Sequence, residues 1–354
     1  MAEPEPSTLV QHGAPRLPAV TVDAYSAELR DEGGFVGDRA SSRAFRAILD
    51  DWRDVLRSVG EDPLGAKPTE DLSKKTLDQV LVEGDPEAAG VVHGAIEDFA
   101  TQLAAVAGRF LELEGWRDTE RIVVGGGLRA SRIGELVIGR ASVLLEAAGH
   151  QVDVRPIHHH PDDAGLVGAA RLAPPWTFAG HDAILAVDVG GSNIRAGIVA
   201  LRLDEAPDFS RSEVHASEVW RHADEAGKPS RTDAVERIGA MLGRFVRRAE
   251  KDGLVLAPFV GVACPGIVAA DGSIERGGQN LPGNWESSRF NLPAAIRALV
   301  PGIGDDETMI VLHNDAVVQG LSELPFVRDV VHWAVLTIGT GLGNAAFTNR
   351  KDDR

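Results

Sequence analysis

Residues 184–199 read ILAVDVGGSNIRAGIV, and they indicate the fold more clearly than any other part of the chain. An apolar run ends at Asp188, two glycines and a Ser-Asn pair follow, and a second apolar run begins at Ile194. This pattern predicts a strand, a tight turn and a second strand. Glycine lets the backbone approach a ligand closely, so the turn is expected to offer N–H groups to a phosphate, with Asp188 beside it holding a hydrated Mg²⁺. The expected phosphate-binding residues are Gly190, Gly191, Ser192 and Asn193.

A second glycine-rich turn, GTGLG at residues 339–343, follows the apolar run 332–338. Alone, such a turn is a weak signal. Together with the first turn it predicts two hairpins that face each other across a cleft and clamp the β- and γ-phosphates of ATP. The backbone of Gly339 and Gly341 and the hydroxyl of Thr340 would supply the donors.

His313-Asn314-Asp315 follows a predicted strand at 309–312. Reactive groups in α/β proteins gather at such strand ends. A hydroxyl is a poor nucleophile, and a carboxylate in hydrogen-bond reach can take its proton as it attacks the γ-phosphate. Asn-Asp before AVVQGLSEL is also a good helix N-cap, and both interpretations can hold together.

Composition narrows the class of protein. The chain has 354 residues, enough for two domains, and its 44% hydrophobic and 25% charged residues are ordinary for a globular protein. A net charge of −17 without a basic cluster argues against nucleic-acid binding. The single cysteine, Cys264, excludes an internal disulfide and a cysteine-rich zinc site, and we interpret it as a small buried residue. No apolar run is long enough to span a membrane, so a cytoplasmic location is expected.

Periodicity predicts alternating helices and strands, and therefore a mainly parallel or mixed sheet covered by helices. A flexible arm is expected at 1–18 because it is rich in Pro, Glu and Ser. The expected helices are 40–59, 72–82, 85–113, 133–148, 164–172 and 232–252, and the expected strands outside the first hairpin are 121–124, 152–156, 258–263, 309–312 and 332–338.

Taken together, these motifs resemble the actin-like ATPase superfamily and, within it, the ROK sugar kinases. The resemblance implies that Asp315 is the catalytic base. It implies that Asn280, within the N-x-P-x-W-like segment 276–285, binds sugar hydroxyls together with Asn314 and Asp315. Residues 122–127 (IVVGGG) resemble the adenosine motif, so Gly125 and Gly126 would line the adenosine, and 164–170 resembles the helix that closes ROK chains.

The order of these motifs is permuted relative to the family. The adenosine glycines and closing helix occupy 122–172, ahead of the phosphate turns at 188–193 and 339–343. Joining the chain ends would restore the family order, with 173–181 connecting the usual termini. The family's Gly-Glu-x-Gly-His segment and zinc motif are absent, and Glu32, or Glu28, is the candidate for the missing sugar-binding glutamate.

The resemblance therefore predicts a circularly permuted, actin-like (ribonuclease H-like) α/β fold with an interdomain nucleotide cleft. One domain would comprise 182–325, the other 19–165 with 326–349, and 166–181 would hold the closing helix and linker. The implied function is ATP- and Mg²⁺-dependent phosphorylation of a sugar hydroxyl, glucokinase-like, with Asp188 positioning Mg²⁺ through water. A homodimer is left open.

Two other classes of function stay open. The chain could be a catalytically weak sugar or nucleotide sensor, since the Glu-His loop is missing. A ROK transcriptional repressor would need a basic helix-turn-helix, which residues 1–80 do not supply. The tract His158-His159-His160 suggests a metal, but consecutive residues cannot all face one ion, so a solvated or partner-facing tract is favoured.

Overall fold

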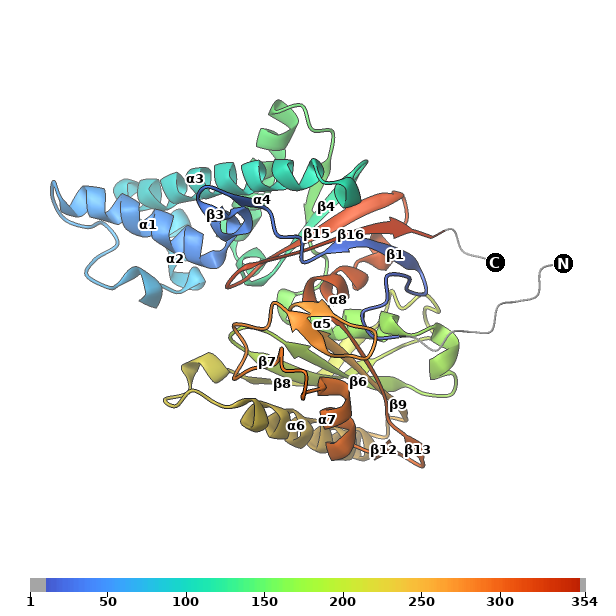
Figure 1. The fold of residues 1–354 in the computed structure, drawn as a ribbon. Helices are drawn as coiled ribbons and strands as arrows, with labels where there is room; N and C mark the ends of the chain where they lie inside the picture. The colour runs from blue at the N-terminus through green and yellow to red at the C-terminus, as the bar shows by residue number, and fades with distance from the viewer. Residues whose placement is uncertain (1–10, 351–354) are drawn as a thin grey trace. The chain divides into compact units, whose positions relative to one another are not determined.

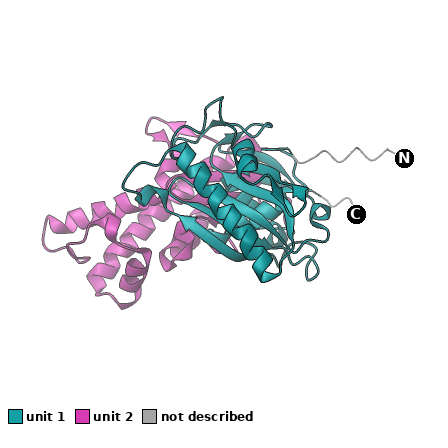
Figure 2. Cartoon of the chain, turned by 90° about the horizontal axis from the view of Figure 1, so that it is seen from below, with its two compact units in different colours: residues 1–26, 162–329, 347–354 teal, residues 27–161, 330–346 magenta. Residues whose placement is uncertain are grey.

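The computed structural model describes residues 11–350, which form an α/β protein built on two five-stranded sheets (Figure 1). The contacts divide the chain into two compact units (Figure 2). Unit 1 comprises 1–26, 162–329 and 347–354, and unit 2 comprises 27–161 and 330–346. Both units are therefore assembled from segments that are distant in the sequence. The expected division into functional domains, which had slightly different bounds, stays a prediction.

The sheet of unit 1 has the strand order β14-β9-β6-β7-β8. Its strands are β6 (Ala183–Val189), β7 (Ile194–Ala200), β8 (Glu213–Trp220), β9 (Leu256–Cys264) and β14 (Met309–Asn314). β6, β7 and β8 form an antiparallel meander, whereas β9 and β14 continue parallel to β6. The central strands are almost wholly buried, as their continuous apolar runs predict.

Helices α6 (Arg231–Asp252) and α7 (Leu292–Leu299) pack their apolar residues into one core with this sheet. α6 begins with a capping box between Ser230 and Asp233 and ends at Gly253, whose φ of 75° suits glycine. Helices α5 (Pro161–Ala169) and α8 (Asp315–Leu321) also belong to unit 1. Two short hairpins complete it: β10 (Ile267–Val268) with β11 (Ile274–Arg276), and β12 (Gly302–Ile303) with β13 (Asp306–Glu307).

The second sheet has the order β1-β16-β15-β4-β5. Its strands are β1 (Val20–Tyr25), β16 (Leu342–Asn349), β15 (His332–Ile338), β4 (Arg121–Gly125) and β5 (Asp153–Pro156). β15, β4 and β5 are parallel, as are β6, β9 and β14 in the first sheet. If the chain is read from β15 to its end and then from its start, the five strands occupy the same order in both sheets.

By sequence, β1 belongs to unit 1, whereas β15, β4 and β5 belong to unit 2. Unit 2 contains in addition the helices α1 (Ser42–Arg57), α2 (Lys74–Glu83), α3 (Pro86–Leu111) and α4 (Arg132–Ala147), and the hairpin of β2 (Arg30–Asp31) with β3 (Gly34–Phe35). Asp85 caps α3 by accepting from the N–H groups of Glu87 and Ala88, as the sequence predicts.

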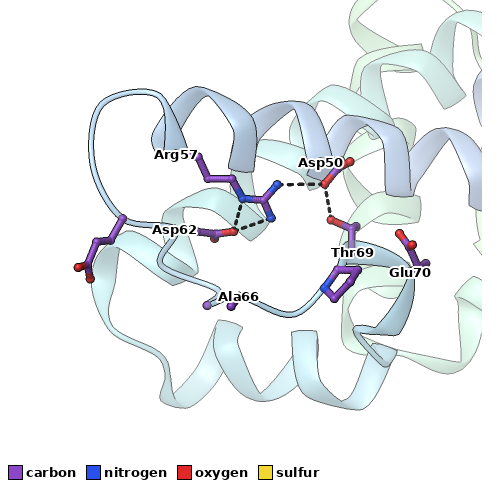
Figure 3. Close-up of a pocket in the computed structure, with 9 residues that line it drawn as sticks. Asp50, Arg57, Asp62, Ala66, Thr69 and Glu70 are labelled. Carbon is purple, nitrogen blue, oxygen red and sulfur yellow. Dashed lines mark hydrogen bonds and ion pairs between the residues drawn. The ribbon is translucent and has the colours of Figure 1, made fainter.

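An arginine fixes the loop between α1 and α2. The guanidinium of Arg53, 0% exposed, donates to Asp62 (2.9 Å), to Thr69 Oγ1 (2.6 Å) and to two loop carbonyls. At the surface above it, Arg57 pairs with Asp50 and Asp62 along the wall of a small pocket (Figure 3). Each nitrogen of the buried guanidinium makes a hydrogen bond, so this network holds the loop onto α1.

The prediction of a flexible arm at 1–18 is wrong for residues 11–18, while 1–10 lie outside the described residues. His12 accepts from the N–H of Leu312 at 3.1 Å, the N–H of Gly13 donates to the Leu312 carbonyl, and Leu17 is 1% exposed. The segment is polar in composition, but it satisfies its backbone against β14. Strands β1 and β8 were also not predicted.

Candidate functional site

The carboxyl ends of β6, β9 and β14 place two aspartates at one edge of the unit 1 sheet. Asp188 on β6 and His313 on β14 are both level with Ala263 on the strand between them. Asp315 follows two residues later as the first residue of α8. Parallel strands present their ends at one edge, so the expected base and the expected Mg²⁺ residue lie close enough to influence each other electrostatically.

Both carboxylates are harder to ionise than in water. Burial, and then the negative charge of Asp188, raise the pKa of Asp315 to about 7. Burial raises the pKa of Asp188 to about 6, although the charge of Arg195 opposes this shift. Cys264 lies at the end of β9 and is 0% exposed. Burial, together with the negative charges of Asp315 and Asp188, holds the pKa of its thiol well above the ordinary value. Cys264 is therefore a neutral thiol, and Asp315 has the pKa of a general base working near neutral pH.

In the turn between β6 and β7, the backbone of Gly190 is hydrogen-bonded, whereas two other N–H groups have no acceptor among the described residues. The N–H of Gly190 donates to the Asn193 carbonyl at 2.8 Å, and the buried His222 ring hydrogen-bonds the Gly190 carbonyl through Nε2 at 3.0 Å. Within the part of the chain that the structure describes, the N–H groups of Gly191 and Asn193 have no hydrogen-bond acceptor. Unpaired amides of this kind are what an anion requires. The sequence analysis missed the supporting role of His222.

Asn280 lies beside this turn. A Cβ atom built on Gly191 would lie 3.1 Å from the Cβ of Asn280. The Asn280 side chain is exposed, and its amide makes no hydrogen bond within residues 11–350. Trp285 anchors the loop, since it is 1% exposed and donates through Nε1 to the Pro282 carbonyl at 2.6 Å. Asn280 therefore offers both a donor and an acceptor next to the turn.

The side chain of Asn314, unlike that of Asn280, is fully hydrogen-bonded. Its Nδ2 donates to the Gly266 carbonyl and to Ser26 Oγ, both at 3.0 Å. Its Oδ1 accepts from the N–H groups of Ala316 and Val317, which caps α8. With 1% exposure and every hydrogen-bonding group engaged, the Asn314 side chain positions Asp315 and has no free group for a ligand.

In unit 2 the expected adenosine glycines and the second glycine turn leave neighbouring strands. β4 pairs in parallel with β15, with Gly125 opposite Thr337. Gly126 has a φ of 86°, and a Cβ there would overlap the Ile338 carbonyl and lie 2.5 Å from the Ile338 nitrogen. Only glycine fits this approach, so the two turns lie side by side at one edge of the sheet. Lys74 donates to the Gly127 carbonyl at this edge.

The second glycine turn is closed by a hydrogen bond between two of its own residues. The N–H of Gly339 donates to the Gly341 carbonyl at 2.9 Å. Among the described residues the N–H of Gly341 has no acceptor, and the space around its Cα is open. Glu32 lies elsewhere in unit 2, exposed at the tip of the β2–β3 hairpin.

Within residues 11–350, no group of three or more His, Cys, Asp or Glu side chains is arranged to hold a metal ion. The donors at the unit 1 edge nevertheless fit Mg²⁺. This ion keeps several water ligands and is commonly bound through one or two carboxylates together with substrate phosphates. Asp188 supplies such a carboxylate next to a turn with free N–H groups.

Gly165 on α5 leaves room for the Asp188 carboxylate, a role that the sequence analysis missed. A Cβ on Gly165 would lie 2.5 Å from Asp188 Oδ2 and 2.7 Å from Cγ. We expect Gly165→Ala to displace this carboxylate and to weaken Mg²⁺ binding at this edge of the sheet by roughly 10-fold, the effect of a small displacement in a positioned site. The measurement is a calorimetric titration of the protein with Mg²⁺. Gly139→Ala, in open space on α4, is the matched control, and equal titrations for the two variants would contradict the prediction.

No protein-family model and no curated protein sequence matches the chain, whereas several solved structures are similar to it. The ROK hexokinase from Thermus thermophilus is similar at 19% identity over 48% of each chain, with a TM-score of 0.35. A ROK family glucokinase from Streptomyces griseus, solved with glucose and AMPPNP, is similar at 20% identity over 48% of this chain and 45% of that one, TM-score 0.35. An exopolyphosphatase-like protein is similar at 14% identity over 71% and 88%, TM-score 0.33.

The chain matches about half the length of these two kinases. The α/β class with mixed sheets, expected from the sequence, is confirmed by the strand order, which is repeated in the two sheets. Among residues 11–350, no helix has the length and apolar character needed to cross a membrane.

Proposed function

We propose that this protein is an ATP-dependent sugar kinase and a circularly permuted relative of the ROK kinases. The observation that carries the proposal is the edge of the unit 1 sheet. There, a carboxylic acid with a pKa of about 7 lies near a second aspartate, next to a glycine turn with unpaired N–H groups and a free amide on Asn280. Phosphoryl transfer to a hydroxyl needs these parts.

In this proposal the Asp315 carboxylate removes the proton from a sugar hydroxyl. The hydroxyl oxygen forms a bond to the γ-phosphorus of ATP, the bond from that phosphorus to the β,γ-bridging oxygen breaks, and ADP leaves. The turns at 190–193 and 339–341 hold phosphate oxygens through the N–H groups of Gly191, Asn193 and Gly341, and Gly125 and Gly126 border the adenosine. Mg²⁺, held by Asp188 through water, would neutralise phosphate charge.

Asn280 would hydrogen-bond the sugar, and Asn314 would act by orienting Asp315. This role for Asn314 replaces the direct sugar contact that the family resemblance implies, because its amide is fully engaged. Glu32 is proposed as a further sugar ligand on sequence grounds alone. Hexoses are the proposed substrate class, and the particular sugar is left to experiment.

The pairing of β1 with β16 supports the proposed permutation. These strands are neighbours in one sheet, and the N–H of Arg350 donates to the Ala19 carbonyl at 3.0 Å. A connection leading from Arg350 to Ala19 would make β15, β16 and β1 consecutive, as β6, β7 and β8 are. Segments that lie side by side can be joined while the chain is opened elsewhere, which makes such a rearrangement of the chain order feasible.

The test is ATP consumption by the full chain with Mg²⁺ and a panel of hexoses and amino sugars. We expect one sugar to stimulate ADP release well above the sugar-free rate, and Glu32→Ala to raise the KM for that sugar. An unchanged KM would remove Glu32 from the site. Binding of Mg-ATP with no stimulation by any sugar would favour a sensor, and failure to bind Mg-ATP would reject the kinase.

A further inference from the structure

The guanidinium of Arg43 lies against the second glycine turn, and only one of its three nitrogens makes a hydrogen bond among the described residues. Arg43, in the first turn of α1, donates through Nε to the Thr340 carbonyl at 3.0 Å. The preceding residue, Ser42, donates its N–H to the Gly339 carbonyl at 2.9 Å. The start of α1 is thus fastened to the turn at two successive carbonyls, although 297 residues separate Arg43 from Thr340 in the sequence.

The rest of the Arg43 guanidinium is available. The side chain is exposed, and over the described part of the chain its two Nη groups make neither a hydrogen bond nor an ion pair. The Nε contact fixes the plane of the guanidinium beside the turn, so the two Nη groups are oriented in advance.

We propose that Arg43 binds the phosphate chain of the nucleotide through its two Nη groups. The inference rests on the proposed function, because that function makes residues 339–341 a phosphate-binding turn. A guanidinium matches two oxygens of one phosphate, and a pair of charge-assisted hydrogen bonds is among the strongest polar contacts a protein makes. Arg43 thus supplies the full positive charge that glycine amides lack, in a chain whose net charge is −17.

The test measures the dissociation constants of Mg-ATP and of adenosine by calorimetry for the full chain and three variants. Arg43→Ala removes all contacts of the side chain. Arg43→Gln removes the charge but keeps an N–H donor for the Thr340 carbonyl. Arg46→Ala, one turn further along the same helix and also exposed, makes the same charge change at a side chain for which the described residues show no hydrogen bond to the turn.

We expect both Arg43 variants to weaken Mg-ATP binding by roughly 10- to 100-fold, the loss of one or two hydrogen bonds to a charged group. Adenosine binding should change less than twofold, and Arg46→Ala should bind both ligands as the wild type does. If Arg43→Gln binds Mg-ATP as tightly as Arg46→Ala, the inference fails while the kinase proposal stands. If adenosine binding falls as much as Mg-ATP binding, Arg43 only shapes the turn, and the phosphate contact is refuted. A wild type that does not bind Mg-ATP overturns both proposals.

Discussion

Asp315→Asn is expected to lower the kcat for sugar phosphorylation by ~10²–10⁴-fold, the usual effect of removing a general base. Asparagine keeps the size of the side chain and the start of α8, so binding of Mg-ATP should be retained. The measurement combines kcat with the dissociation constant of ATP for the same preparation. Cys264→Ser, a change at a neutral buried neighbour that the mechanism does not use, is the control. A fully active Asp315→Asn protein would show that another group takes the proton.

The raised pKa of Asp315 predicts how kcat/KM depends on pH. The base works only as the carboxylate, and its pKa is raised to about 7, so kcat/KM should fall tenfold per pH unit below that value. A rate that stays flat down to pH 5 would contradict the assignment.

Protein stability supplies an independent readout of that pKa. The folded-state pKa of Asp315 lies above that of the unfolded chain, so the folded form holds a proton that the unfolded form has lost. The associated stabilisation is complete below about pH 4, declines as pH rises from there, and is lost above about pH 7. The advantage of Asp315→Asn over the wild type in unfolding free energy should therefore grow by about 2–3 kcal/mol between pH 5 and pH 8. Urea unfolding at both pH values measures it.

Gly126→Ala is expected to destabilise unit 2 by about 2–5 kcal/mol, combining backbone strain at positive φ with steric overlap. The φ of 86° disfavours any side chain, and the new Cβ would overlap the backbone of Ile338. Because backbone cannot move aside as a flexible side chain can, the ends of β4 and β15 must separate. Nucleotide binding should weaken with them.

Gly139→Ala again provides the comparison, since a Cβ at this helical position meets no atom within 4 Å and alanine favours helix. Thermal unfolding and ATP titration of both variants measure the difference. If Gly126→Ala unfolds and binds ATP like Gly139→Ala, the close approach of the two turns is not needed, and Gly126 has no part in a nucleotide site.

Much of the fold could be predicted from local sequence, and the two missed strands have different causes. The first hairpin, the long helix α3 with its Asp85 cap, and α6 carry strong periodicity and end signals. β8 was missed because its positions are exposed or half-buried and polar residues occupy half of them. β1 was missed because β16, its partner, lies at the other end of the chain. Pairing between distant segments leaves no local pattern.

The candidate site divides in the same way. By itself the sequence determined where glycine turns follow apolar strands and where an aspartate ends a strand, because these signals depend on adjacent residues. Only the tertiary structure decided that Asn280 is free while Asn314 is fully engaged, that Gly165 makes room for Asp188, and that Arg43 reaches Thr340. Hydrogen-bond partners and steric limits are set by residues that the chain brings together from far apart, and no spacing along the sequence records them.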